Sequence, residues 1–281
     1  MILVAGGTGR LGSVLVPRLA AQDQDVRVLT RDLARAGHLQ GVATEIVVGD
    51  VRDPASLTAA LDGVATVVSA VHGFAGPGRV TPQSVDRDGN ANLIAAAERV
   101  GAGMVLISGV GVAPDSPMEL FRAKYEAEQH LRVSGLDWTI VRPTAFLELW
   151  AEIMTKPIVL GRGDNPINFV SVVDVAAVAD RAVIETSWRG RTLEVGGPHD
   201  LTFNQLAELL QAARGHRARI RHVPRSLLRL AAPFARPARA ALAMDTCDMT
   251  FDAAAHREGY ADLPFTDVET ALTRAGTTAD R

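Results

Sequence analysis

A glycine-rich turn, AGGTGRLG from Ala5 to Gly12, carries the clearest chemical signal in the sequence. Its glycines are spaced Gly6-x-x-Gly9-x-x-Gly12 and, offset by one, Gly7-x-Gly9-x-x-Gly12. Such glycines permit a tight turn and let backbone N–H groups approach a pyrophosphate, and the helix that follows adds partial positive charge. Because the apolar run ILVA precedes the turn, we expect a dinucleotide there, with a packing-only turn as the alternative. The residues assigned to it are Gly6, Gly7, Thr8, Gly9, Arg10, Leu11 and Gly12.

The stretch VLTRDLAR, at the end of the second apolar run, bears on which dinucleotide binds. A site for NAD(H) favours an acidic side chain at this place, but the tip reads Thr30 and then Arg31. Asp32 comes slightly late and is expected to cap a helix. Arg31 and Arg35 could form a charge-assisted fork on a 2′-phosphate, or could be a solvated surface pair. We therefore expect NADP(H), with NAD(H) as the alternative.

The ends of the third and fourth apolar runs are expected to complete the cofactor site. The Gly49–Asp50 pair suits a contact with adenine, although a simple turn would have the same sequence. Val51 follows it directly. Ala70 and Val71 end the fourth run, and we assign them to the cofactor as well.

Short apolar runs alternate with helical periods through the first half of the chain, which is typical of a parallel sheet buried on both faces. Right-handed crossovers then favour the strand order of dinucleotide-binding folds. The sequence predicts a Rossmann-type α/β domain over 1–150 and a smaller substrate lobe over 151–281, with some segments packing back on the main sheet. Helices are expected from Arg10, after Pro54, over Val85 to Val100, over Met118 to Val133 and in LTFNQLAELLQAA.

The composition of the 281 residues is ordinary for a folded globule, with 47% hydrophobic and 22% charged residues. The net charge of −3 gives no reason to expect nucleic acid or an anionic membrane as a partner. A single cysteine, Cys247, fits a reducing compartment, and the histidines lack metal-ligand spacing. Because MILVAGG begins as a buried strand and not as a signal peptide, we expect a cytoplasmic protein.

The apolar stretch from Leu227 to Met244 is interrupted by three arginines and two prolines, so it is too broken to span a bilayer. It is expected to be an amphipathic packing segment or lid, with interfacial membrane contact as the lesser alternative. Elsewhere, cations are almost all arginine: lysine occurs only at Lys124 and Lys156.

Several segments together resemble the NmrA-like NAD(P)-binding branch of the atypical short-chain dehydrogenases/reductases, which includes isoflavone-reductase-like enzymes. They are the glycine turn, SGVG from Ser108, KYEAEQHLRVSGLDWTIVRP, VDRDGNANLIAAAERVGAG, FVSVVDVAAV and EVGGPHDLTFNQLAELL. The resemblance extends over roughly residues 1 to 225. It implies a Rossmann fold, a nicotinamide cofactor, and a place beside the nicotinamide for Pro143, Thr144, Ala145 and Phe146.

Typical members of that superfamily use Tyr-x-x-x-Lys with a serine on the preceding strand, the lysine lowering the tyrosine pKa. Lys124 and Ser108 match, but Leu120 occupies the tyrosine position. Tyr125 lies about 100° around the helix from Lys124 and should not substitute. The resemblance implies that Lys124 holds the nicotinamide ribose or acts as general acid; a surface pair with Glu128 is the structural alternative. Ser108 is expected to bind a substrate carbonyl, or only to cap its strand.

The glycine-rich loop HGFAGPG would place His72 and Phe74 at the mouth of such a site, although most loop histidines are only solvated. The leading hypothesis is an NADP-dependent oxidoreductase that reduces a small apolar carbonyl, enone or quinone. The rival is a non-catalytic NAD(P)-binding sensor that acts on a protein partner, and a structural subunit is a third reading.

Overall fold

A computed structural model describes residues 1–74, 80–215 and 218–279 of the chain. Two compact units make up the chain. The first unit is Met1–Arg142 with Val175–Glu194, and the second unit is Pro143–Asp174 with Val195–Arg281. Among the described residues, no helix is both long and apolar enough to cross a lipid bilayer.

A seven-stranded sheet forms the centre of the first unit, in the order β10-β6-β5-β4-β1-β2-β3. Every neighbouring pair from β3 to β6 is parallel. The order reverses between β1 and β4, where parallel α/β sheets open a crevice at the carboxyl ends of the strands. This confirms the predicted Rossmann-type fold and its strand order. The strands are β1 (Ile2–Ala5), β2 (Val26–Thr30), β3 (Glu45–Val48), β4 (Thr66–Ser69), β5 (Gly103–Ile107), β6 (Trp138–Pro143) and β10 (Arg191–Val195).

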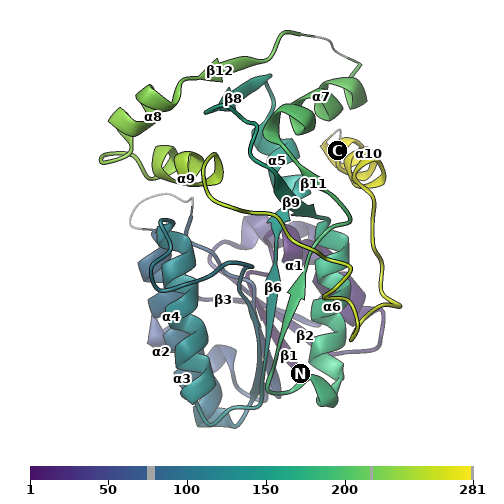
Figure 1. The fold of residues 1–281 in the computed structure, drawn as a ribbon. Coiled ribbons are helices and arrows are strands. Elements are labelled where there is room, and N and C mark those ends of the chain that lie inside the picture. Colours follow the sequence, from purple (N-terminus) through teal and green to yellow (C-terminus); the bar gives the residue numbers. More distant parts are fainter. Residues whose placement is uncertain (75–79, 216–217, 280–281) are drawn as a thin grey trace. The chain divides into compact units, whose positions relative to one another are not determined.

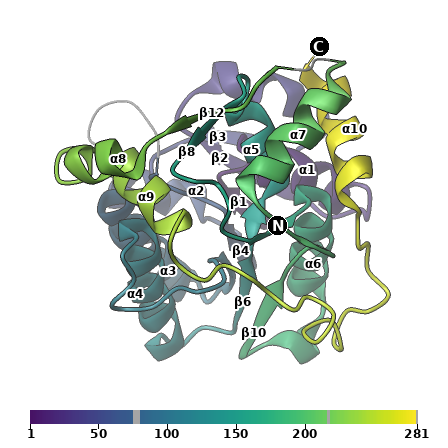
Figure 2. The ribbon, with the colours of Figure 1, turned by 45° about the horizontal axis from the view of Figure 1, so that its top comes forward.

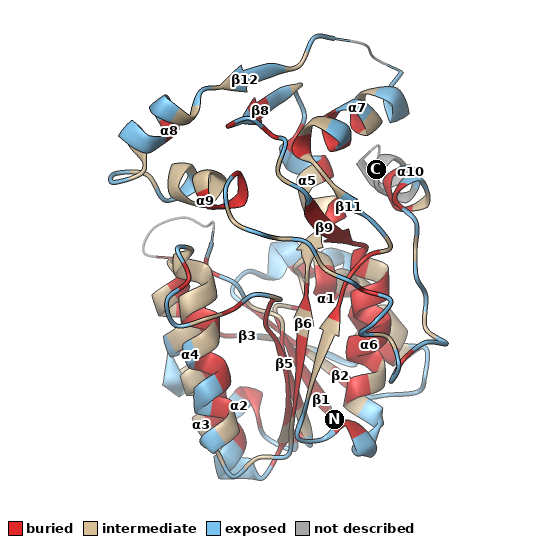
Figure 3. Cartoon of the chain, in the orientation of Figure 1, coloured by how far each residue is buried: buried red, intermediate tan, exposed pale blue. Residues whose placement is uncertain are grey.

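Helices cover both faces of this sheet, with α2, α3 and α4 on one face and α1 and α6 on the other (Figures 1 and 2). Apolar side chains from the strands and from the covering helices make the core, which includes Leu3, Val67, Leu93 and Leu106. Figure 3 shows that buried residues are concentrated in the strands of this sheet. The helices are α1 (Arg10–Ala20), η1 (Leu33–Leu39), α2 (Pro54–Ala60), η2 (Gln83–Arg87), α3 (Asp88–Val100), α4 (Glu119–Val133), α6 (Val172–Ile184) and η3 (Thr186–Trp188).

The second unit contains two small sheets, β11-β9-β7 and β12-β8, together with helices. Thr202 and Gln205 form a capping box at the start of α7, the helix predicted in LTFNQLAELLQAA. The elements of the second unit are β7 (Ala145–Phe146), α5 (Leu147–Ile153), β8 (Ile158–Leu160), β9 (Ile167–Val170), β11 (Asp200–Leu201), α7 (Phe203–Ala213), β12 (Arg221–Val223), α8 (Arg225–Ala231), α9 (Arg236–Met244) and α10 (Val268–Ala279).

The boundary between the units differs from the expected division at 150 and 151. The chain leaves the first unit directly after β6, because β7 already pairs with β9 in the second unit. The segment Val175–Glu194 then returns to the first unit and ends in β10, which lies beside β6. Arg142 on β6 and Glu194 on β10 are joined by an ion pair of 3.2 Å.

Candidate cofactor site and active site

The glycine turn leaves no room for a side chain at Gly6 or at Gly12. Gly6 has a φ of +88°, in the left-handed region, and a Cβ there would lie 2.6 Å from the carbonyl oxygen of Ala70. A Cβ on Gly12 would lie 2.4 Å from both the carbonyl oxygen of Gly6 and the Cα of Gly7. Gly9 precedes α1 without a side-chain cap, and the first turn of α1 carries no acidic residue. The N–H groups at this helix start are therefore available to an anion, which fits a dinucleotide pyrophosphate.

The ends of β1 and β4 meet at this turn. The N–H of Ala70 donates to the carbonyl oxygen of Ala5 at 2.9 Å, and the close approach of Gly6 is to Ala70 and to the amide nitrogen of Val71. The structure thus brings together Gly6, Ala70 and Val71, three residues that the sequence assigned to the cofactor site.

The tip of β2 carries two exposed guanidinium groups. Asp32 caps η1 by accepting a 2.9 Å hydrogen bond from the N–H of Ala34, as its position suggested. Arg31 and Arg35 lie in the chain on either side of this cap and are solvent-exposed. Within the described ranges, neither guanidinium lies at ion-pair distance from a carboxylate. Both cations therefore remain available to a ligand.

Asp50 follows β3 and is held by its neighbour Arg52, whose guanidinium lies 2.6 Å from the carboxylate. This hydrogen bond lowers the pKa of Asp50; partial burial opposes the shift, and the positive charge of Arg31 adds to it. The hydroxyl of Ser56 accepts from the backbone N–H of Asp50 at 3.0 Å. Val51 is buried. The turn after β3 is thus held in place, with the Asp50 carboxylate paired to Arg52 and its backbone N–H bonded to Ser56.

Lys124 is buried on α4 and does not form the surface pair with Glu128 that its spacing allowed. Its ammonium donates to the carbonyl oxygen of Ile107 at 3.0 Å and lies 3.2 Å from Oδ1 of Asp86. Asp86 comes from η2, which packs against α4. The expectation of a Lys124–Glu128 pair is therefore wrong, because Asp86 takes the ammonium and Glu128 has other partners.

Asp86 is a functional candidate that sequence reasoning missed. Its side chain is fully buried, and its Oδ2 accepts a 2.7 Å hydrogen bond from the N–H of Gly73. One turn later, Asn90 donates to the carbonyl oxygen of Asp86 and accepts from Ser69 at the end of β4. The spacing of Asp86 and Asn90 puts both on one helix face, which was the available signal. The short π-helix at η2 is a type of distortion that is frequent at functional sites.

Glu128 is the centre of a second buried charge cluster in the first unit. Arg142 binds it in a bidentate manner, with contacts of 2.8 and 2.6 Å, and Arg132 lies 3.0 Å away. Burial alone would raise the pKa of Glu128, but the hydrogen bonds and positive charges, Arg142 first among them, hold it below its usual value. Glu128 is therefore ionised at neutral pH and locks α4 to β6.

Ser108 directly follows β5 and is buried. Its N–H donates to the carbonyl oxygen of Val141 at 2.7 Å, which continues the ladder with β6. The hydroxyl lies close enough to Glu128 to lower the pKa of that carboxyl, yet among the described residues it has no partner in hydrogen-bond geometry. Its neighbour Ile107 is the residue that holds Lys124. A buried hydroxyl without a protein partner calls for an explanation, and a bound ligand would supply the missing hydrogen bond.

His72 stands in the electrostatic surroundings of Lys124. Desolvation by the surrounding protein lowers the pKa of His72, although part of the residue is exposed to solvent. The negative charge of Asp86 opposes this shift, and the positive charges of Lys124 and Arg10 add to it. The imidazole is therefore neutral at pH 7. Phe74 is exposed, and the remainder of the HGFAGPG loop, residues 75–78, lies outside the described residues.

The expected nicotinamide residues Pro143, Thr144, Ala145 and Phe146 belong to the second unit. Within it, the hydroxyl of Thr144 lies 2.9 Å from the amide oxygen of Asn168, and its N–H donates to the carbonyl oxygen of Val195 at 2.9 Å. Their contact with nicotinamide stays a prediction. Tyr125 lies on α4, next to Lys124 in the chain, and Tyr260 is buried in the second unit.

The sequence of the chain is similar to those of several known proteins. The chain is 33% identical over 226 residues to an NAD(P)H azoreductase of Xenophilus azovorans, covering 78% of this chain and 76% of the relative. It is 31% identical over 242 residues to the photosystem II assembly factor Ycf39 of Synechocystis sp., covering 84% of this chain and 74% of the relative.

The fold is shared with an NADPH-dependent quinone oxidoreductase of Escherichia coli that was crystallised with NADPH. The TM-score is 0.77 at 22% identity, and the match covers 98% of this chain and 99% of that one. The sequence model described as NAD(P)H-binding matches residues 6–186, from the glycine turn through α6. The expectation of a nicotinamide dinucleotide is thereby confirmed, and this chain belongs to the NAD(P)H-binding family.

Proposed function

We propose that this chain is an NADP-dependent oxidoreductase that reduces a small apolar carbonyl, enone or quinone. The observation that carries the proposal is the buried, unpartnered hydroxyl of Ser108 beside the peptide that fixes the Lys124 ammonium. Ser108 directly follows β5, and the Lys124 ammonium binds the carbonyl oxygen of Ile107, the last residue of that strand, in the unit that holds the glycine turn. Ligands of parallel α/β folds bind at this edge of the sheet.

Each end of the cofactor has residues suited to it. The backbone of Gly6 to Gly12 would hold the pyrophosphate, and Asp50 and Val51 would flank the adenine. Arg31 and Arg35 would bind a 2′-phosphate, which gives the preference for NADP(H) over NAD(H). Lys124 would contact the nicotinamide ribose, and Pro143 to Phe146 are proposed to flank the nicotinamide. When bound, this cofactor supplies a hydride equivalent.

The chain's own groups would then position the acceptor and manage one proton. Ser108 Oγ–H is a donor for the acceptor's oxygen. Lys124 is held by Asp86 and by the carbonyl oxygen of Ile107, so its direction is fixed before any ligand arrives. Because Leu120 occupies the position of the usual tyrosine, the proton for the acceptor's oxygen comes from Lys124 or from water. A quinone suits this arrangement, since its reduced oxygen is a weak base and needs little acid assistance.

The relatives support both this proposal and its rival. The names of an azoreductase and a quinone oxidoreductase describe reductases, whereas the name of an assembly factor describes work on other proteins. The missing tyrosine is compatible with a non-catalytic NAD(P)-binding sensor as well. Turnover separates the two, because a sensor binds NADPH without consuming it.

The deciding experiment follows NADPH oxidation by absorbance with a panel of quinones, enones and azo compounds. Wild type, Ser108→Ala and Lys124→Ala are compared, with Lys156→Ala as the control for the loss of a lysine. We expect turnover by wild type and by Lys156→Ala. General acid–base groups contribute about 10²–10⁴-fold, so Lys124→Ala should fall by up to that factor if it donates the proton.

The pattern across variants distinguishes the roles. A higher KM for NADPH with unchanged kcat in Lys124→Ala assigns the lysine to ribose binding, and a lower kcat assigns it to proton transfer. Absence of turnover with every acceptor, in a sample that binds NADPH, would reject the reductase in favour of the sensor.

A further inference from the structure

A strongly basic segment lies in the second unit and has no part in the proposed reaction. Residues 209–244 contain eight arginines and no aspartate or glutamate. Acidic residues elsewhere in the sequence balance this positive charge, so the net charge of the whole chain is only −3. The arginines are Arg214, Arg217, Arg219, Arg221, Arg225, Arg229, Arg236 and Arg239.

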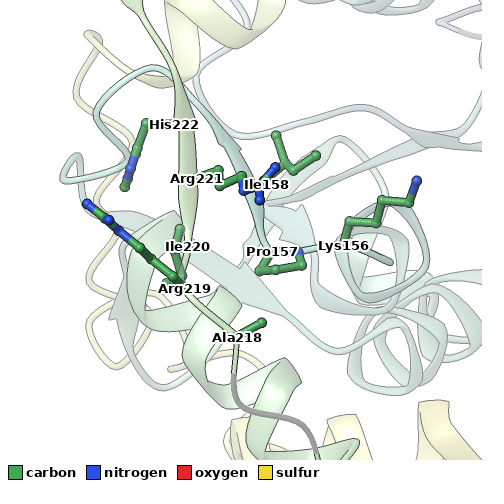
Figure 4. A pocket seen from close by; sticks show the side chains of 8 residues that line it. All are labelled: Lys156, Pro157, Ile158, Ala218, Arg219, Ile220, Arg221 and His222. Carbon is green, nitrogen blue, oxygen red and sulfur yellow. The ribbon is translucent and has the colours of Figure 1, made fainter.

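Part of this segment lines a groove beside β8 and β12, which pair in parallel. The groove has a cavity volume of about 630 Å³, and its lining includes Lys156, Arg219, Arg221 and His222 but no acidic residue (Figure 4). The Nε2 of His222 lies 2.9 Å from the side-chain oxygen of Asn204, at hydrogen-bond distance. Over the described part of the chain, the charged ends of Lys156, Arg219 and Arg221 contact no carboxylate. We call these three residues the basic groove.

The chain runs from the basic groove directly into α8, which exposes large apolar side chains. Leu227 is 56% exposed, Leu230 is 73% exposed, and Phe234, just after the helix, is 90% exposed. We call these three residues the apolar ridge; Figure 3 shows the largely exposed helix that carries it. Arg229 is exposed between two of them.

The apolar ridge is held outward by a fixed support. Leu228 on the opposite side of α8 is buried, and α8 packs against α9. Arg225 at the start of α8 binds the buried carboxylate of Asp245 and donates to the carbonyl oxygen of that residue at 2.7 Å. Asp245 also accepts from the N–H groups of Arg162 and Gly163. The exposure of the ridge is therefore a property of an anchored helix.

We propose that the second unit docks on an anionic lipid surface through the basic groove and the apolar ridge. Cations beside exposed leucine and phenylalanine are the combination that a bilayer interface matches, with headgroup phosphates for the charges and the acyl boundary for the apolar side chains. Long arginine side chains can keep their charged ends at headgroup level while their stems cover apolar surface. A nucleic acid would match the charges but would leave Leu230 and Phe234 without a partner.

This docking is peripheral, so it agrees with the finding that no described helix could span a bilayer. It does not rest on the proposed function, since a reductase and a sensor could both use it. The net charge of −3 gave no reason to expect an anionic membrane as a partner. Electrostatic attraction to a membrane acts only within about a Debye length, however, so the charge of the segment nearest the membrane decides it and not the net charge of the chain.

The test is flotation of the full chain with vesicles of phosphatidylcholine alone or of phosphatidylcholine mixed with phosphatidylglycerol. We expect binding to the mixed vesicles that weakens as salt is added, and much weaker binding to the neutral ones. Each arginine near an anionic leaflet contributes about fivefold in partitioning, so Arg219→Gln/Arg229→Gln should lose on the order of 25-fold. The control Arg99→Gln/Arg191→Gln removes two exposed charges from the first unit and should bind as wild type.

A second pair of variants tests the apolar ridge. Phe234→Ser should reduce binding about tenfold or more, the scale for losing burial of one phenylalanine. Val133→Ser, at an apolar residue that is 84% exposed on α4, is the matched control and should have no effect.

Three results would overturn the proposal. The first is a folded wild type that floats with neither vesicle, or with both equally. The second is anionic-vesicle binding that Arg219→Gln/Arg229→Gln and Phe234→Ser leave unchanged. The third is self-association in sedimentation that Phe234→Ser abolishes without vesicle binding, which would assign the ridge to a second copy of the chain.

Discussion

The two lysines of the chain stand in opposite surroundings. Lys124, in the first unit, is buried, lies 3.2 Å from the fully buried Asp86 and is held by a backbone carbonyl. Lys156, in the second unit, lines a groove together with Arg219 and Arg221, and none of the described lining residues is acidic. One cation is fixed by the protein, and the other is left for a partner. The same residue type thus has two different energetic roles.

The contrast extends to the charges around each lysine. In the first unit, buried carboxylates hold two of the cations: Asp86 holds Lys124, and Glu128 holds Arg142. In the second unit, Asp245 holds Arg225, but within the described ranges no carboxylate lies at ion-pair distance from the basic groove. A preorganised site keeps its geometry without ligand, whereas an uncompensated basic surface gains most of its stabilisation when an anion arrives.

The largest expected difference is in stability. Lys124→Ala leaves the Asp86 charge buried and uncompensated, so it should lower the free energy of unfolding by about 3–5 kcal/mol. Lys156→Ala should change it by no more than about 0.5 kcal/mol. Urea unfolding without cofactor measures the free energy of unfolding of both variants. In the double variant Lys124→Met/Asp86→Asn the buried charge is removed as well, so part of the lost stability should be recovered. Equal effects at the two lysines would contradict the comparison.

The Glu128 cluster gives a pH-dependent test of the same idea. Because the folded pKa of Glu128 is lowered, its stabilisation is fully present above the unfolded value of 4.5 and is lost as pH falls through the lower folded pKa. At pH 7, Glu128→Gln should cost about 3 kcal/mol, the low end for breaking a buried pair. The gap between variant and wild type should narrow as the pH falls below 4.5.

Glu126, an exposed neighbour on α4 that lies 3.7 Å from Arg87, is the matched control. Glu126→Gln should change stability by less than about 1 kcal/mol at any pH. A gap between Glu128→Gln and wild type that stays constant in acid would show that the glutamate acts through packing and not through its charge.

The glycine turn is expected to show a smaller effect, seen in binding. Gly12→Ala puts a Cβ 2.4 Å from backbone atoms, so the turn must shift. Overpacking of this kind costs about 1–3 kcal/mol, which corresponds to a loss in NADPH affinity of roughly 10- to 100-fold by calorimetry. Gly37→Ala is the control, because a Cβ at Gly37 meets nothing within 4 Å. Equal affinities would remove the turn from the cofactor site.

The smallest expected effect concerns the choice between NADPH and NADH. Arg31→Ala and Arg35→Ala should each reduce the preference for NADPH by about tenfold, the scale of a charge-assisted hydrogen bond in a partly exposed site. The ratio of the two dissociation constants is the readout, and Arg229→Ala is the control from the basic segment. Equal weakening for both cofactors would mean that the arginines do not read the 2′-phosphate.

Much of the fold could be predicted because its signals are local. The periods of apolar residues gave the strands and helices, and the glycine spacing gave the turn that joins β1 to α1. The right-handed crossover rule then gave the strand order. The change of unit after Arg142 could not be located from sequence, because a two-residue strand, Ala145–Phe146, has no apolar pattern that would indicate its pairing with β9.

The partners of Lys124 show what local signals cannot supply. From spacing along α4, Glu128 was the natural candidate, since residues one turn apart are neighbours on a helix surface. Asp86 lies 38 positions away in sequence, on another helix, and only the packing of η2 against α4 brings it to the ammonium. Glu128 is then free for Arg142 on β6.

By itself, the sequence determined the Rossmann-type fold, the glycine turn and the absence of a Tyr-x-x-x-Lys dyad, because each is written in the spacing of neighbouring residues. The tertiary structure alone decided which carboxylate holds which cation, left the Ser108 hydroxyl buried without a partner, and exposed Leu230 and Phe234 on an anchored helix. The physical reason is that burial and ion pairing depend on distances across the fold, and these are set by packing between segments far apart in the chain.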